Sequence, residues 1–153
     1  MMKKTKNENI DIARILEKEL GVSFSNYEFK LDSWGDVDNY CELNNGDLLL
    51  LECEQGQKHP NTNVLKLYPY LENHFNKRIV LIHYFFPENK SPKNRLELCN
   101  FLASKMEILF SSRFQYVSLK CDKSSLAGKL KEQKKGLMQQ LLTGKKRLKI
   151  ENK

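Results

Sequence analysis

The chain has 153 residues, 40% of them hydrophobic and 29% charged, and a formal net charge of +7. This length suits one compact domain with its own core, and the composition excludes wholesale disorder. The longest apolar runs, at 48–51 and 79–86, are far shorter than the roughly 18 residues of a membrane helix, so no membrane span is expected. The basic N-terminus lacks the apolar segment of a secretory signal, which predicts a cytoplasmic protein.

The first half of the chain begins with a helical pattern and continues with strand-like patterns. Apolar residues on one helical face predict a helix at about 8–20, closed by Gly21. The segment 22–31 favours a short strand or an irregular lead-in. The segments 37–43 and 48–54 flank the turn-forming sequence Asn-Asn-Gly-Asp, which predicts a β-hairpin.

Helices and strands then alternate. Residues 61–75 have helical spacing, with a bend or break expected near Pro69. Residues 78–86 are β-branched and aromatic and predict a buried strand. A helix at 96–109 and a last strand at 114–119 follow. The predicted order is helix, hairpin, helix, strand, helix, strand.

The composition changes after Asp122. Residues 120–153 hold eleven Lys or Arg and three Asp or Glu, a net +8, so residues 1–119 are near −1. We therefore expect an α/β domain at 1–121 and a basic amphipathic helix with a tail at 122–153. The positive balance favours a polyanionic partner such as DNA.

An acidic cluster is expected on the hairpin. Alternate residues of a strand share a face, so Glu52 and Glu54 point the same way, and the preceding strand offers Asp38. An odd-numbered loop or a bulge would pair Asp38 with Glu52, whereas a two-residue turn would pair Asn39 with it. Hard cations such as Mg²⁺ bind such carboxylates, so the cluster is either a metal site or a separated, solvated set of charges.

The pattern over about residues 8–120 resembles the PD-(D/E)xK nuclease superfamily, in which a helix, a hairpin bearing an Asp and then E-x-K, a helix and a strand follow one another. Here GDVDN supplies Asp38, with Asp36 as a rival, and LLLLECEQ supplies Glu52 and Glu54. The resemblance implies a restriction-endonuclease-like α/β fold, a mixed sheet with flanking helices. It also implies Mg²⁺ or Mn²⁺ at Asp38 and Glu52, and DNA as the substrate.

The chain departs from this family where the motif has its lysine. Glu54 stands at that position, which favours a non-catalytic module of the same fold as the alternative. Lys66, on the following helix, is the preferred substitute. Gln57, His59 and Asn63 follow the carboxylates and are candidates for contacting phosphate or orienting water, although a loop and a helix cap would use the same residue types.

Trp34 lies in the turn before the hairpin. Its ring could stack on a base or cover the hairpin, and covering is the more common use of such a residue.

The C-terminal sequence KLKEQKKGLMQQLLTGKKRLK looks very like the C-terminal helix of type I restriction specificity subunits. That resemblance implies docking to restriction-modification subunits, here through Leu130, Leu137 and Leu141. The alternative is that the helix packs on the chain's own core with its lysines in solvent.

Together these patterns predict a metal-dependent DNA endonuclease of prokaryotic restriction or defence. Its catalytic residues would be Asp38, Glu52, Glu54 and Lys66, and a homodimer would suit double-strand cutting. The alternative is a non-catalytic adaptor or inhibitor of the same fold that docks to a type I restriction-modification complex.

Overall fold

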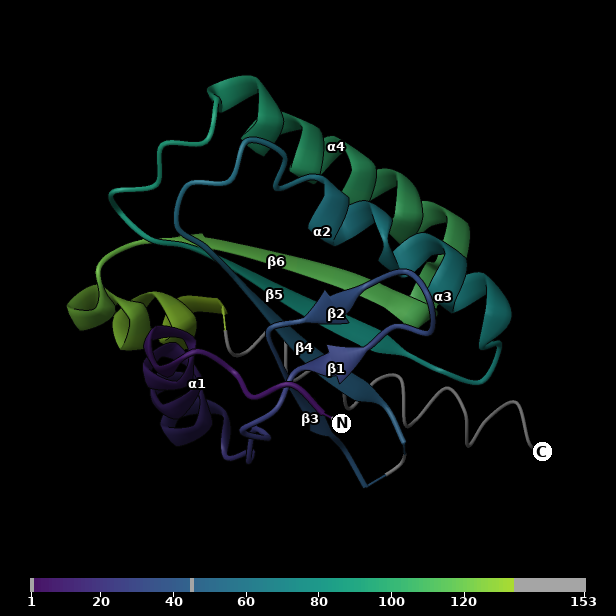
Figure 1. Cartoon of the computed structure of the whole chain (residues 1–153), viewed down its shortest axis with the longest axis horizontal. Helices are drawn as coiled ribbons and strands as arrows, with labels where there is room; N and C mark the ends of the chain where they lie inside the picture. The colour runs from purple at the N-terminus through teal and green to yellow at the C-terminus, as the bar shows by residue number, and fades with distance from the viewer. Residues whose placement is uncertain (1, 45, 134–153) are drawn as a thin grey trace.

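A mixed four-stranded β-sheet lies between two layers of helix in the computed structural model, which describes residues 2–44 and 46–133 (Figure 1). Strand β3 (Asn39–Glu42) is antiparallel to β4 (Leu48–Glu54), and β5 (Ile79–Phe85) and β6 (Phe114–Lys120) continue the sheet in parallel, in the order β3-β4-β5-β6. The predicted α/β class, with a mixed sheet and flanking helices, is confirmed.

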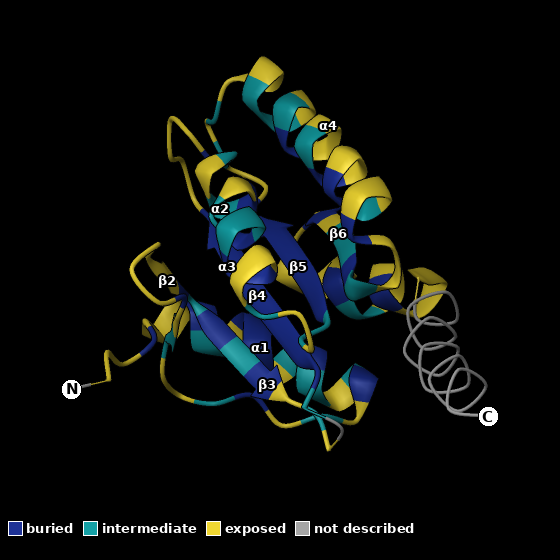
Figure 2. Ribbon diagram, turned by 90° about the vertical axis from the view of Figure 1, so that its right-hand side faces the viewer, coloured by how far each residue is buried: buried dark blue, intermediate teal, exposed yellow. Residues whose placement is uncertain are grey.

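The two central strands are buried along their whole length because helices cover both faces of the sheet (Figure 2). This explains why LLLLECE and IVLIHYF read as nearly continuous apolar runs. Alternation divides the side chains between two cores. Leu49, Leu51 and Cys53 point into one core, whereas Leu48 and Leu50 point into the other. Glu52 and Glu54 continue the second series, so they lie on a face that is otherwise apolar.

One helical layer consists of α1 (Asn7–Leu20) and the helical residues 123–133. Helix α1 ends as predicted at Gly21, which adopts a left-handed conformation with φ of 68°. Leu126 and Leu130 are fully buried in the core beneath α1. The predicted docking role of Leu130 is therefore wrong, because this side chain already packs inside the chain. Leu137 and Leu141 lie outside the described residues.

The other helical layer consists of α2 (Thr62–Leu65), α3 (Leu67–Asn73) and α4 (Lys93–Phe110), followed by a 3₁₀ turn at Ser111–Arg113. The helix predicted at 61–75 is thus two helices that meet at Lys66. Pro69 has no N–H to donate to the carbonyl of Leu65, four residues earlier, and its ring crowds that carbonyl; Leu65 is the last residue of α2. The break at Lys66 is therefore the one predicted near Pro69.

A small hairpin precedes the sheet. Strands β1 (Phe29–Lys30) and β2 (Asp36–Val37) pair antiparallel, which places a short strand in the predicted lead-in. The connection between β3 and β4 spans residues 43–47, and this odd length sets a register that pairs Asn39 with Leu51. No helix in the described ranges is both long and apolar enough to cross a membrane.

Candidate active site

Asp38 and Glu52 meet where β3 begins and β4 nears its end. Since Asn39 pairs with Leu51, the next step of the register brings Asp38 opposite Glu52, which was one of the two arrangements left open by the sequence. The Asp38 carboxylate accepts a hydrogen bond from the Cys53 N–H at 2.8 Å. The Asp38 carbonyl accepts one from the Thr5 hydroxyl at 2.6 Å. Asp38 is therefore fixed both through its backbone and through its side chain.

Lys66 reaches this pair from the junction of α2 and α3. Its ammonium donates to the Glu52 carboxylate, to the Asn63 side-chain oxygen at 2.8 Å and to the Asp36 carbonyl at 2.5 Å. The substitute lysine chosen from the sequence is thus in contact with the central carboxylate. Asp36 contributes its backbone, while the side chain next to Glu52 is that of Asp38.

Glu52 is only 3% exposed, and the groups around it shift its pKa in opposite directions. Burial raises the pKa of Glu52 well above its usual value, Lys66 lowers it, and the nearby charge of Asp38 raises it again. The burial effect is the largest of the three. Because like charges close together in a buried site disfavour ionisation, this carboxylate pair favours any further cation that reaches it.

Glu54 has a different set of contacts. Its side chain is fully buried, and one carboxylate oxygen is bonded both to His83 Nε2, at 2.8 Å, and to the Asn63 amide. His83 Nδ1 lies 2.7 Å from the Tyr116 hydroxyl. If the phenol donates to Nδ1, Nε2 carries the ring proton and donates to Glu54. Glu54 thereby holds Asn63, and Asn63 in turn holds Lys66.

The three predicted substrate contacts differ in their placement. Asn63 belongs to the network that joins Glu54 to Lys66. Gln57 and His59 lie on the exposed loop after β4, where their backbone carbonyls accept hydrogen bonds from Ser91 at 2.6 Å and Thr62 at 2.8 Å. Of the three, Asn63 alone contacts the carboxylate and lysine groups within the described ranges.

The sequence did not identify two parts of this network. His83 and Tyr116 come from β5 and β6, and both lie on the face that carries Glu54. Alternation in the β5 sequence could have placed His83 on that face. The partner on β6 required the sheet order, which the residues alone do not fix.

The residues that the structure describes include no group of three or more His, Cys, Asp or Glu side chains placed to hold a metal ion. The pair of Asp38 and Glu52 nevertheless suits one class of cation. Mg²⁺ is usually held by one or two carboxylates together with water and substrate phosphate. This oxygen donor set, in a site where burial disfavours a lone negative charge, fits such an ion.

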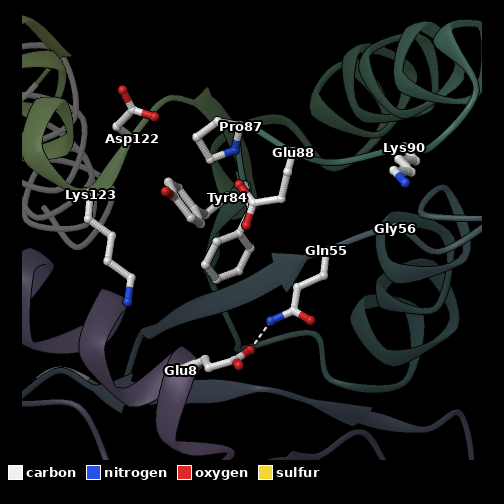
Figure 3. A pocket seen from close by; sticks show the side chains of 10 residues that line it. Glu8, Gln55, Gly56, Tyr84, Pro87, Glu88, Lys90, Asp122 and Lys123 are labelled. Atoms are coloured by element: carbon white, nitrogen blue, oxygen red, sulfur yellow. Dashed lines mark hydrogen bonds between the residues drawn. The ribbon is translucent and has the colours of Figure 1, made fainter.

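A cavity of about 780 Å³ opens at the ends of β4 and β5, on the α1 side (Figure 3). Figure 3 shows Glu8 and Gln55 pointing toward one another across it, joined by a hydrogen bond. Asp38, Glu52 and Lys66 do not line it. Its lining residues with charged side chains are three carboxylates and two amines: Glu8, Glu88, Asp122, Lys90 and Lys123. The mixed charge gives this cavity no clear preference for an anion.

Comparison of the chain with protein-family models, curated proteins and solved structures found no match. Its function is therefore inferred from the geometry around Asp38, Glu52 and Lys66.

Proposed function

We propose that the chain is a metal-dependent DNA endonuclease of prokaryotic restriction or defence, which hydrolyses phosphodiester bonds at Asp38, Glu52 and Lys66. The observation that carries the proposal is the contact between the Lys66 ammonium and the buried Glu52 carboxylate, with Asp38 directly beside it. This is the carboxylate, carboxylate and lysine set of the PD-(D/E)xK resemblance. The hairpin that carries both carboxylates, within a mixed sheet, supports a restriction-endonuclease-like fold.

Asp38 and Glu52 would hold Mg²⁺ or Mn²⁺. A divalent ion bound there supplies an activated water and neutralises charge on the phosphate. The three N–H donors of the Lys66 ammonium are given to Glu52, Asn63 and the Asp36 carbonyl. With Glu52 bound to the ion, the donor now given to Glu52 would turn to a non-bridging phosphate oxygen and would stabilise the negative charge that builds up during hydrolysis. The bonds of Lys66 to Asn63 and to the Asp36 carbonyl hold the ammonium beside Glu52 when a phosphate arrives.

Glu54 acts in this proposal as a positioning residue. Its contacts run through Asn63 to Lys66 and through His83 to the centre of the sheet. The carboxylate at the family's lysine position thus orients the lysine that has moved to the helix.

The test is plasmid nicking over time in Mg²⁺ and in Mn²⁺, with the wild type, Glu52→Ala and Lys66→Met purified in parallel. Lys58→Met is the matched control, because Lys58 is an exposed lysine on the loop after β4. We expect metal-dependent nicking by the wild type and the control, and none by the two site variants. Circular dichroism checks that each variant is folded.

Equal nicking by the wild type and Glu52→Ala would refute the site. No nicking by the folded wild type would refute the enzyme and favour the non-catalytic adaptor. Calorimetric titration with Mn²⁺ adds a second readout, because retained metal affinity in Glu52→Ala would contradict the assigned ligands.

A further inference from the structure

A small cavity of about 310 Å³ lies against Lys66, next to the candidate active site. Its apolar walls come from the turn before β2 and from helices α2 and α3. Two of its residues are large and half exposed, Trp34 at 50% and Leu65 at 47%. The residues that line it are Trp34, Thr62, Leu65, Lys66, Tyr68 and Pro69.

Trp34 is presented on a well-supported turn. Its N–H donates to the Leu31 carbonyl at 2.9 Å. The neighbouring Asp32 carboxylate lies 2.8 Å from His74 Nε2, and the His74 ring stacks on Tyr70 with the centroids 4.1 Å apart. The turn is therefore anchored to α3. Trp34 is 50% exposed, so about half of the residue's surface remains available to a ligand.

Lys66 lies both at the small cavity and at the candidate active site. Its aliphatic stem lines the small cavity, while its ammonium contacts Glu52. The cavity and the carboxylates are thus separated by the length of one lysine side chain. A ligand that suits this arrangement has a flat apolar ring joined to an anionic group, as a nucleotide has.

We propose that this cavity binds an unstacked nucleobase of DNA, which stacks on Trp34 while the adjoining phosphate contacts Lys66. The inference rests on the proposed function, and it names the substrate class of the same site: single-stranded DNA or DNA that is locally unpaired. Aromatic side chains bind bases of any sequence through their π-faces, and the volume is at the lower end of ordinary ligand pockets, which suits a ring more than a larger group. A base within an intact duplex cannot reach such a wall unless it leaves the stack.

The larger cavity of Figure 3 is a poorer candidate for the same ligand. Its charged lining residues are three carboxylates and two amines, and this mixed charge gives no net attraction for a phosphate. Lys66 is the charged residue that lines the small cavity, and its ammonium, which pairs with Glu52, is the group there that can contact a phosphate.

Intrinsic fluorescence tests the proposal directly, because Trp34 is the only tryptophan of the chain. The full chain is titrated in EDTA, which prevents cutting, with short oligothymidylate and with an abasic sugar-phosphate oligomer of equal length. Stacking predicts that oligothymidylate quenches the emission and that the abasic oligomer does not. Binding of both oligomers with equal affinity and without quenching would mean that phosphate contacts alone hold the DNA, and would overturn the proposal.

Substitutions separate stacking from folding. We expect Trp34→Ala to weaken oligothymidylate binding by roughly 5- to 100-fold, measured by anisotropy of a labelled oligomer. Trp34→Phe keeps an aromatic face and should remain close to the wild type. Phe75→Ala is the matched control, since Phe75 is 81% exposed and does not line the cavity. Equal loss of affinity in Phe75→Ala, or none in Trp34→Ala, would contradict the inference.

The nicking assay distinguishes this inference from the proposed function. Metal-dependent nicking without quenching would leave the endonuclease standing and remove the base pocket. Quenching by oligothymidylate without nicking would leave the base pocket standing on a chain that binds DNA without cutting it.

Discussion

Replacement of Glu54 tests whether this residue orients the site or binds metal. In Glu54→Ala, the buried His83 ring loses its acceptor, and an unsatisfied buried donor costs about 1–3 kcal/mol. Asn63 loses a second bond, but it is only half-buried, so water replaces part of that interaction. Loss of the second carboxylate oxygen, which is buried without a hydrogen-bond partner in the described part of the chain, offsets some of this cost. We expect a net loss of about 2–4 kcal/mol in the free energy of unfolding.

Glu54→Gln is the control, because its amide oxygen can accept the same two hydrogen bonds. Its NH₂ group takes the place of the oxygen that has no partner in the described part of the chain, so part of the destabilisation remains. We expect its stability to lie between those of the alanine variant and the wild type. Thermal unfolding followed by circular dichroism measures both variants, and the alanine variant should melt roughly 5–15 °C lower. Nicking gives a second readout: the glutamine variant should keep Mg²⁺-dependent cutting, since the contact chain to Lys66 persists. Loss of cutting in a stable Glu54→Gln protein would refute the positioning role and favour a metal ligand.

Two further outcomes follow from burial. Burial raises the folded-state pKa of Glu52, so the stabilisation that comes from binding this proton is fully present below the ordinary carboxyl pKa and is lost as pH rises through the raised pKa. Urea unfolding from acid to neutral pH should show this decline in the free energy of unfolding. The Glu52→Gln variant should show a smaller decline. An unchanged slope in Glu52→Gln would assign the decline to other groups. Leu130→Ala should lower the free energy of unfolding by about 2–5 kcal/mol, because the side chain is fully buried. Leu109→Ala should lower it much less, because Leu109 is 57% exposed. Equal unfolding temperatures for the two variants would show that the helix at 123–133 does not belong to the core.

The hairpin could be predicted because the turn-forming sequence Asn-Asn-Gly-Asp lies between two strand-like segments. The shared face of Glu52 and Glu54 could be predicted because alternate residues of a strand point the same way. The position of Lys66 could also be predicted, since the following helix had to cover the sheet near the end of β4. The partner of Asp38 could not, because it depended on the number of residues in the turn. Until that number is known, the strand pattern of residues 48–54 is compatible with Glu52 lying opposite either Asp38 or Asn39.

Two other features could not be predicted, because they depend on tertiary contacts that sequence periodicity does not reveal. The hydrogen bond between His83 and Tyr116 joins two residues that lie 33 positions apart on neighbouring strands, so it depends on the order of strands in the sheet. The helix at 123–133 has an amphipathic pattern that would serve a partner protein or its own core equally well. Leu126 and Leu130 lie in the same core as the buried residues of α1, so the described part of the helix predicted at 122–153 packs on the chain's own core.

The burial of position 54 also gives a physical reason why this position carries no lysine, unlike the E-x-K motif that the hairpin sequence resembles. Position 54 is fully buried, and a lysine there would place its cation in the core beside His83, at a high desolvation cost. Lys66 instead enters from the junction of α2 and α3, and its side chain is 13% exposed, so it is not fully desolvated. With the lysine on the helix, the strand position becomes available to an acceptor that holds Asn63 and His83. The absence of lysine from the strand is therefore compatible with a complete site, provided that Glu54 and Asn63 keep Lys66 against Glu52.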